Sequence, residues 1–367
     1  MKKYILILSL FLGAITFSGP VLASNDIDTF EARVVKVLDQ REVVAENGAK
    51  LVQQDLVMRG LKGEWKDKEI VYRGIGQVDV LSGQVYEEGD EVLAQRTTGP
   101  GGEDAFAPTE YLRRDWLYLL AALFALVVVA VGGWKGLRSL VALAASFFLI
   151  LKFILPAILA GYSPFLVSLA GGLVILAFII YLTEGFNRKS NLAMASVFFS
   201  LLITLGLSVL FTWLTRLSGL DEDAGFLIGM TTNQIDFRGL LLAGFLIGAI
   251  GVLDDVVIGQ IEAVGQLKKT NPLMSSKDLF LAGYKIGNTH LGSMINTLFL
   301  TYAGASLPLL LIFSLQDGSA INFSQAINSE VIATEIVRTL VGSIGVALSM
   351  PIATALAAKW LKIDHKH

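Results

Sequence analysis

Three carboxylates lie within the apolar stretch GAIGVLDDVVIGQIEAV (residues 248–264), where their types and spacing are suited to chemistry. Asp254 and Asp255 are adjacent, and Glu262 follows about two helical turns later. A carboxylate at membrane depth is costly, so such a residue usually faces a bundle interior and marks an ion, proton or substrate pathway. The sequence predicts one of these roles for the aspartates. The alternative is a buried hydrogen bond that only fixes packing.

Helical spacing separates the two aspartates. Residues three or four apart share a helix face, and one such stripe comprises Gly244, Gly248, Gly251, Asp255, Gly259 and Glu262. Gly244 and Gly248 form a GxxxG pair, which lets helix backbones approach closely. We therefore predict that Asp255 points into a tight helix interface and that Asp254 is turned about 100° away from it. Glu262 is interpreted as a solvated charge at the cytoplasmic boundary.

Two later apolar segments carry similar stripes. The first comprises Asn288, Gly292 and Asn296, with Thr297 on the adjoining face, and the second comprises Glu335, Arg338, Gly342 and Gly345. A rise of about 1.5 Å per residue puts Asp255 and Asn296 at similar depth, near enough to meet. Three helices with such stripes are predicted to form the wall of a shared interior.

Simpler readings of these stripes stay open. The glycines alone are packing devices in many helices. Glu335 and Arg338, which fall in the outer half of the membrane with Lys152, can neutralise one another, and Lys152 can snorkel outward. His290 is interpreted as a loop or interface residue. The candidates for an ion, proton or substrate pathway therefore comprise Asp255, Asp254, Asn296, Thr297, Asn288, Glu335, Arg338 and Lys152.

The composition excludes several function classes. The chain has 367 residues, of which 54% are hydrophobic and 17% charged, and this is too apolar for a soluble domain. A net charge of −3 gives no indication of a nucleic-acid partner. Cysteine is absent and only three residues are histidines, so we expect no catalytic, cofactor-binding or metal site. HExxH, GxSxG and P-loop motifs are also absent, which predicts that the chain is not an enzyme.

The chain divides into a small soluble part and a membrane part. Residues 1–23 have the layout of a signal peptide. Residues 24–98 alternate between short strand patterns and turn signals, which predicts an extracytoplasmic β domain, either an OB-like barrel or a sandwich. Residues 99–115, rich in Gly and Pro at their start, are predicted to be a linker. An α-helical transmembrane domain is expected over 116–358 and a cytoplasmic tail over 359–367.

About seven spans are expected in the membrane part. They run roughly over 116–133, 137–160, 164–183, 191–214, 240–261, 291–313 and 331–358. Lys and Arg gather in alternate connections, which the positive-inside rule assigns to the cytoplasm. The sequence thus predicts a multi-pass plasma-membrane protein with its β domain outside and its C-terminus inside. The second span contains Lys152 and Pro156, and it is either continuous or broken.

Four motifs lie in residues 244–310: GxxxD at 251–255, NP at 271–272, GxxxxGxMxNTL at 287–298 and YAG at 302–304. With them the chain resembles the YibE/F family of bacterial multi-pass membrane proteins, over most of residues 30–358. The resemblance is to the longer family type, and it implies a β domain before the spans and a shorter related subunit as a partner. GxxxD coincides with Asp255, and the extra acid at Asp254 is a departure. The resemblance implies no particular biochemical activity.

Two functions of different classes are predicted. The first is a transport or permeation component, in which Asp255 binds a cation or carries a proton. Asn296 and Thr297 would then supply neutral ligands, and Arg338 or Lys152 would set the outer field. The alternative is a membrane-embedded assembly or accessory protein whose β domain binds an extracytoplasmic partner. The expected partners are the lipid bilayer and either a second copy of the chain or the shorter related subunit.

Overall fold

The structure is a computed structural model that describes residues 28–44, 50–76, 80–81, 85–98, 104–220, 235–314 and 323–361. The described residues form two compact units, one ending at Val127 and one beginning at Val128, and the boundary falls inside helix α2 (Arg114–Leu149). The predicted signal peptide and most of the predicted C-terminal tail lie outside the described residues.

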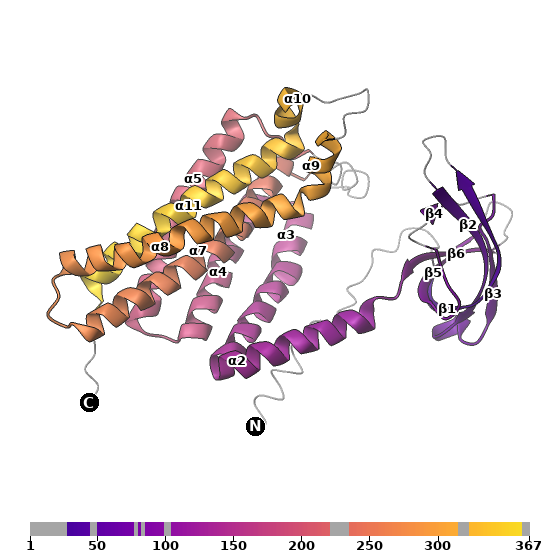
Figure 1. Ribbon diagram of the computed structural model, residues 1–367, viewed down its shortest axis with the longest axis horizontal. Coiled ribbons are helices and arrows are strands. Elements are labelled where there is room, and N and C mark those ends of the chain that lie inside the picture. The colour runs from indigo at the N-terminus through magenta and orange to yellow at the C-terminus, as the bar shows by residue number, and fades with distance from the viewer. Residues whose placement is uncertain are drawn as a thin grey trace. The chain divides into compact units, whose positions relative to one another are not determined.

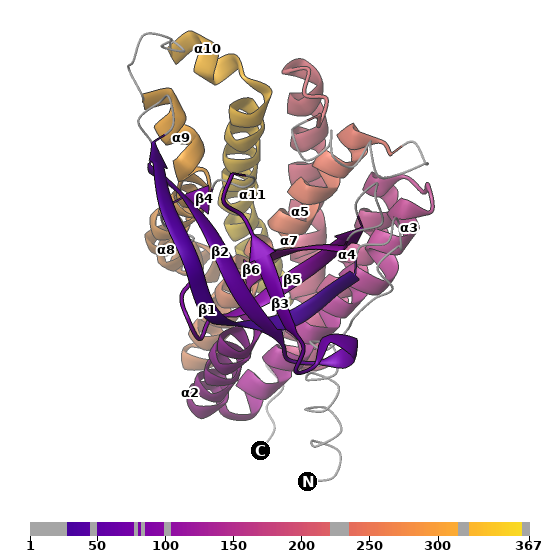
Figure 2. The same cartoon turned by 90° about the vertical axis from the view of Figure 1, so that its right-hand side faces the viewer.

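The first unit is built on one antiparallel sheet. Its strands are β1 (Asp28–Val44), β2 (Lys50–Gly60), β3 (Glu69–Arg73), β4 (Val80–Leu81), β5 (Glu91–Thr98) and β6 (Asp104–Tyr111), and a 3-10 turn η1 (Gly63–Trp65) follows β2. The order is β3-β2-β1-β5-β6, with β4 paired to β2. Two register shifts in the β1–β2 pairing bend these long strands, as Figure 2 shows. Because β3 and β6 also contact each other, the single sheet curls toward a barrel.

Alternation along the strands places apolar side chains on the inner face. This core comprises Phe30, Ala32, Val34, Leu56, Met58, Ile70, Tyr72, Tyr86, Val92 and Ala94. Gln54 is a buried polar residue beside it. Its side chain accepts a hydrogen bond from the Tyr86 N–H (2.9 Å) and donates one to the Tyr86 carbonyl (2.8 Å). One amide group thus satisfies both backbone groups of Tyr86, as a neighbouring strand would.

The structure differs from the predicted linker at residues 104–111, which form strand β6 and pair with β5. An ion pair between Arg96 and Asp104 (2.9 Å) fixes the start of β6. The Tyr111 hydroxyl donates to the Val85 carbonyl (2.8 Å) and fixes its end. These contacts join residues distant in sequence, which the Gly and Pro content before residue 104 does not reveal.

A charged contact joins the sheet to the start of α2. Arg114, the first residue of α2, donates to the Glu31 carboxylate of β1 (2.8 Å). This hydrogen bond, together with the nearby Lys62, holds the pKa of Glu31 below its usual range.

A break inside α2 separates the first two predicted spans. Gly133 has φ 54° and ψ −133°, a backbone conformation that glycine adopts at little cost. Beyond α2 the path continues through η3 (Ile150–Ile154), a π-helical segment that contains Lys152, and through α3 (Leu155–Leu159). The second predicted span is therefore a continuous helical segment that passes Pro156 in the first turn of α3.

Five longer helices form the bundle of the second unit: α4 (Pro164–Glu184), α5 (Arg188–Leu214), α7 (Phe237–Thr270), α8 (Ser276–Ala305) and α11 (Glu330–Trp360). Two short helices, α9 (Leu307–Ser314) and α10 (Phe323–Asn328), lie between α8 and α11 in sequence. α7 contacts α4, α5, α8 and α11, and Figure 1 shows it among them. Asn187, Asp236 and Ser275 each accept a hydrogen bond from the backbone N–H three residues on, which defines where α5, α7 and α8 begin.

By length and apolarity, five helical segments of the described chain are able to cross a membrane: Arg114–Leu159, Pro164–Glu184, Arg188–Leu214, Phe237–Thr270 and Glu330–Trp360. The first contains the first two predicted spans on either side of Gly133. The predicted span at 291–313 is different, because α8 begins at Ser276 and is more polar than these five. The total of seven spans therefore stays a prediction.

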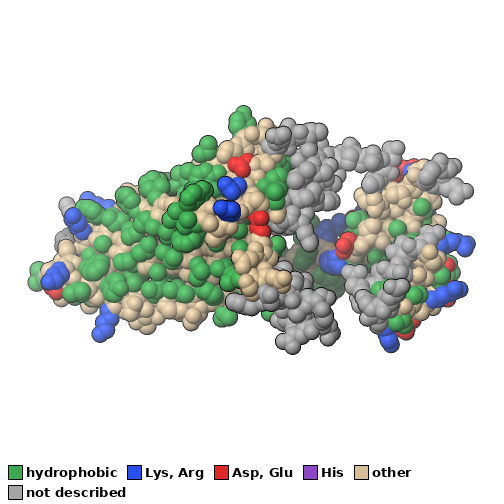
Figure 3. Space-filling model, turned by 90° about the horizontal axis from the view of Figure 1, so that it is seen from above, with side chains coloured by type: hydrophobic (Ala, Val, Ile, Leu, Met, Phe, Trp, Pro, Cys, Tyr) green, Lys and Arg blue, Asp and Glu red, His purple; other side chains and the backbone are tan. Residues whose placement is uncertain are grey.

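The surface of the helical unit is also apolar. Figure 3 shows apolar side chains over the middle of this unit and Lys or Arg side chains at its left-hand end. The exposed apolar residues of this unit include Phe147, Phe148, Phe199, Leu210 and Trp213. Exposed apolar surface of this extent is typical of a protein that lipid surrounds.

α5 presents a stripe of hydroxyl groups to the bundle interior. Ser196, Ser200, Thr204, Ser208 and Thr212 are four residues apart and all buried. The first four hydroxyls donate to the carbonyl four residues earlier in the same helix. Small side chains here let α5 pack closely on α11, where Gly345 lies against Thr204.

Candidate functional site

The two aspartates of α7 lie in environments opposite to those predicted. Asp254 is partly buried, and its Oδ1 atom is enclosed without a hydrogen-bond partner among the described residues. The charges of Asp255 and of Glu184 on α4 repel its carboxylate. Asp255, predicted to be in a tight interface, is exposed. The reason is that α7 buries the face carrying Leu253 and Val257, and Asp254 lies next to that face.

The glycine stripe of α7 differs from the prediction for the same reason. Apart from the helix's own backbone, no atom of the described residues lies within 4 Å of the place a Cβ would take at Gly244, Gly251 or Gly259. Gly292 of α8 is equally open. At Gly248 a Cβ would lie 3.1 Å from the Tyr302 hydroxyl. The stripe is thus mostly an open face within this chain rather than a close helix contact.

A cavity between α7 and α8 lies next to Asp255. We call it the proximal cavity, because it is the nearest of three to the α7–α8 turn. It encloses about 200 Å³ and is lined by Asp255, Val256, Gly259, Gln260, Ala263, Ile286, Gly287, His290, Leu291, Met294 and Met350. Asn296 does not line this cavity, although the sequence predicted that Asp255 and Asn296 would meet. Asp255 instead shares the wall of the cavity with His290.

A second, much smaller space follows along α8. This central cavity holds about 10 Å³ and is lined by Thr204, Ser208, Phe245, Gly248, Ala249, Val252, Leu298, Tyr302, Arg338, Gly342 and Val346. The Arg338 guanidinium lies over the Phe245 ring at 5.2 Å. It also donates to Glu335 (2.7 Å), so these two charges neutralise one another as one sequence interpretation predicted.

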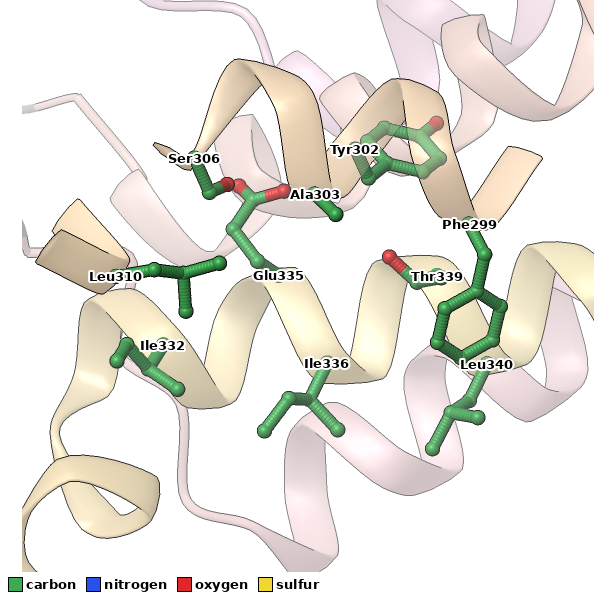
Figure 4. Close-up of a pocket in the computed structure, with 10 residues that line it drawn as sticks. All are labelled: Phe299, Tyr302, Ala303, Ser306, Leu310, Ile332, Glu335, Ile336, Thr339 and Leu340. Carbon is green, nitrogen blue, oxygen red and sulfur yellow. The ribbon is translucent and has the colours of Figure 1, made fainter. Parts of the chain in front are cut away.

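A third space lies between α8, α9 and α11. This distal cavity has a volume of about 250 Å³ and is lined by Phe299, Tyr302, Ala303, Ser306, Leu310, Ile332, Glu335, Ile336, Thr339 and Leu340. Figure 4 shows Glu335 rising from α11 toward Ala303 of α8 and toward Ser306, the residue that follows α8. Tyr302 lines both this cavity and the central one, so the two adjoin.

The three cavities succeed one another along α8. Residues 286–294 line the proximal cavity, Leu298 and Tyr302 the central one, and residues 299–310 of α8 and α9 the distal one. Each cavity therefore has at least one ionisable side chain in its wall. Asp255, Arg338 and Glu335 are thus distributed over the three cavities, whereas most of the glycine and asparagine positions of the predicted stripes do not face a shared interior.

The polar residues of α8 point elsewhere. Asn288, Gly292, Asn296 and Thr297 are all exposed, whereas the sequence predicted that they would face α7 and α11. α8 instead packs through Leu279, Gly283, Gly287 and Leu298. The asparagine stripe therefore forms an outward-facing polar surface on a helix whose neighbours are largely apolar.

Ion pairs occupy the end of the bundle near the α7–α8 turn. Lys135 pairs with Glu184 (2.7 Å), and Lys189 pairs with Glu262. Glu262 is about half exposed, which agrees with its interpretation as a boundary charge. Lys152 is half-buried in η3 and does not line any of the three cavities.

Sequence reasoning missed three interior polar features: Gln260, Tyr302 and the hydroxyl stripe of α5. Gln260 is 5% exposed, and its amide nitrogen donates to the Gly283 carbonyl and to the Thr354 hydroxyl. It thereby ties α7 to α8 and α11. The spacing of four in Ser196–Ser200–Thr204–Ser208 was a readable signal for the stripe, because residues four apart share a face.

The comparison with family models gives one match. Residues 120–363 match the model described as YibE/F-like protein. The chain belongs to the YibE/F-like family. No curated protein and no solved structure matches it. The matched range covers the whole helical bundle and all of α2 except its first residues, so the three cavities lie within the family region.

Family and structure together indicate a membrane protein. The YibE/F-like region contains the five apolar helical segments, apart from the first residues of the first one. Its α7 carries both aspartates and its α8 the outward asparagines. Among the described residues of the YibE/F-like chain, no group of three or more His, Cys, Asp or Glu side chains is arranged to hold a metal ion.

Proposed function

We propose that this YibE/F-like protein is a transport or permeation component of the plasma membrane, which passes protons or a small cation along α8. One observation carries the proposal. Three cavities follow one another along α8, and Asp255, Arg338 and Glu335 line them in turn. Ionisable residues at membrane depth are costly and typically mark such pathways. The proposal assigns no enzymatic reaction to the chain.

The central cavity would be the closed point of this pathway. Its volume of about 10 Å³ is at the lower limit for one water molecule. The positive charge of Arg338 opposes a cation there, while its ion pair with Glu335 offsets part of that charge. Passage therefore requires a movement of Tyr302, whose hydroxyl lies against Gly248, or of Arg338 in the same cavity wall.

Flux measurements in proteoliposomes test this function. Wild-type protein should carry a proton or cation current, and Asp255→Asn and Glu335→Gln should each lower it at least tenfold. Glu262→Gln is the matched control, because Glu262 lies on α7 but lines none of the three cavities. Equal flux in wild type and Asp255→Asn, including no flux in either, would contradict the proposal.

We also infer the predicted orientation, with the β unit outside the cell and the α7–α8 turn inside. The support is the number of basic residues near that turn and at the end of α11: Lys189, Lys268, Lys269, Lys277 and Lys359. Because the chain has no cysteine, Thr98→Cys and Ser275→Cys give single reactive sites. An impermeant maleimide applied to intact cells should label the first variant and spare the second. Labelling of the second alone would reverse the orientation.

A second candidate function is a membrane-embedded assembly or accessory protein. The exposed Asn288 and Asn296 on α8, and the open Gly244 and Gly251 on α7, favour it. Amide groups and small residues promote helix association in lipid. A stoichiometric partner, either a second copy or a shorter related subunit, should then co-purify in mild detergent. Its retention by Asp255→Asn protein that has no flux defect would favour assembly over transport.

A further inference from the structure

The wall of the proximal cavity combines several kinds of side chain that can bind a cation. Its wall contains the Asp255 carboxylate, the His290 imidazole, the amide of Gln260 and the thioethers of Met294 and Met350. These residues come from α7, α8 and α11. Two of the seven methionines of the chain therefore line one cavity together with one of its three histidines.

Two of these side chains, Gln260 and Met350, lie against Gly287. A Cβ placed there would lie 2.7 Å from Gln260 Oε1 and 2.8 Å from Met350 Sδ. The Gln260 amide nitrogen is already engaged by Gly283 and Thr354 (2.8 and 2.7 Å), and this turns its carbonyl oxygen toward Gly287. Because Gly287 has no side chain, this oxygen and this sulfur atom both pack against the same point of its backbone.

The donor set selects among cations. Thioethers are soft ligands that suit Cu(I), and imidazole also binds copper well. Zn²⁺ sites use thiolate, imidazole and carboxylate ligands, and Mg²⁺ and Ca²⁺ sites use oxygen atoms. Asp255 is exposed at the edge of the cavity, where its negative charge attracts a cation before the softer donors bind it.

We propose that the proximal cavity binds a soft monovalent cation, Cu(I), through Met294, Met350 and His290, with Gln260 as an oxygen donor and Asp255 at the entrance. This rests on the proposed function, because it names the class of cation that the α8 pathway would carry. Gly287 contributes because it has no Cβ, which lets the Gln260 oxygen and the Met350 sulfur both lie close to its backbone.

Ag(I), which has the same charge and closed-shell configuration as Cu(I) but does not undergo redox cycling, serves as the probe. Purified full-length protein in detergent is titrated with Ag(I), passed through a desalting column and analysed for bound silver. We expect one Ag(I) bound per wild-type chain above the background of a Met294→Leu/Met350→Leu double variant. Each single Met→Leu variant should raise the Kd at least tenfold, and Gly287→Ala should do the same.

Methionine is also a common packing residue in helix bundles, so the control is Met194→Leu. Met194 is half-buried on α5 and lines none of the three cavities. Its variant should bind Ag(I) as wild type does. Met294, which is only partly buried, gives a variant that tests the site even where Met350→Leu fails to fold. Equal loss in Met194→Leu and Met294→Leu, or no silver above background in wild type, would overturn the proposal.

The outcome separates this inference from the proposed function. Proton flux that depends on Asp255, in a protein that binds no Ag(I), refutes the Cu(I) site and leaves transport standing. Silver binding that depends on Met294, in a protein without any flux including that of Ag(I), supports the site and refutes transport.

Discussion

Asp254 is expected to destabilise the bundle that contains it. Its Oδ1 atom is enclosed and has no partner among the described residues, and two further carboxylates, Asp255 and Glu184, repel it. An unsatisfied buried polar group costs about 1–3 kcal/mol, and a charged one costs more. Asp254→Asn removes the charge while keeping the shape of the side chain. We therefore expect it to stabilise the protein by about 1–2 kcal/mol.

For a chain of this size, whose entropy of unfolding is about 0.8 kcal/mol/K, such a change raises the unfolding midpoint by roughly 1–3 °C. The measurement is thermal unfolding in detergent, followed by fluorescence of the five tryptophans, at pH 9 so that ordinary carboxyl groups are charged. Asp255→Asn is the matched control. It makes the same chemical change one residue along, on an exposed side chain. It relieves only the repulsion between the two aspartates, so its midpoint should rise clearly less than that of Asp254→Asn.

A lower midpoint for Asp254→Asn would refute this reasoning, because it would mean that the carboxylate has a stabilising partner. Equal shifts in the two variants would refute it as well, since they would reflect net charge rather than enclosure. If Asp254→Asn is more stable and also loses flux, the carboxylate is kept for function at the expense of stability.

Three further outcomes are expected. Gln54→Leu leaves both backbone groups of Tyr86 unpaired and should cost the β unit about 2–4 kcal/mol in chemical unfolding; Gln53→Leu, on the more exposed side of β2, should cost far less. Burial raises the pKa of Tyr86 to about 12. Its contribution to stability is therefore complete below about pH 10 and is lost as the pH rises toward 12, which alkaline unfolding of wild type against Tyr86→Phe would show. Gly133→Ala forces a side chain into a left-handed φ and should lower the free energy of unfolding by about 1 kcal/mol more than Gly132→Ala, where φ is not positive.

Residue spacing predicted which groups share a helix face but not which way that face points. Asp255 and the glycines of α7 do lie on one stripe, as a spacing of three and four requires. The direction of the stripe depends on which neighbours are larger and more apolar. α4, α5 and α11 cover the opposite face through Leu253, Val257 and Val264. No local pattern in α7 contains that information.

Other elements follow the same distinction between local and distant causes. The ion pair of Glu335 with Arg338 is local, at a spacing of three, and was readable from the sequence. The start of α8 at Ser276 is also local, because Ser275 caps it, but the hydropathy pattern concealed it. Strand β6 depends on pairing with β5, and the cavities depend on contacts among three helices. Those features appear only in three dimensions.

The hydroxyl stripe of α5 has a mechanical consequence. Four of its hydroxyl groups donate their hydrogen bonds to carbonyls of α5 itself: those of Ser196, Ser200, Thr204 and Ser208. These hydrogen bonds therefore do not fix the register of α5 against α11. A small rotation or translation between the two helices would break none of these bonds. Between the stripe itself and α11, the contacts that such a movement changes are van der Waals contacts, such as that of Thr204 with Gly345. The position of α11 along α5 is therefore set by contacts elsewhere, such as the hydrogen bonds from Ser218 and Gly219, just after α5, to the carboxylate of Glu330 at the start of α11.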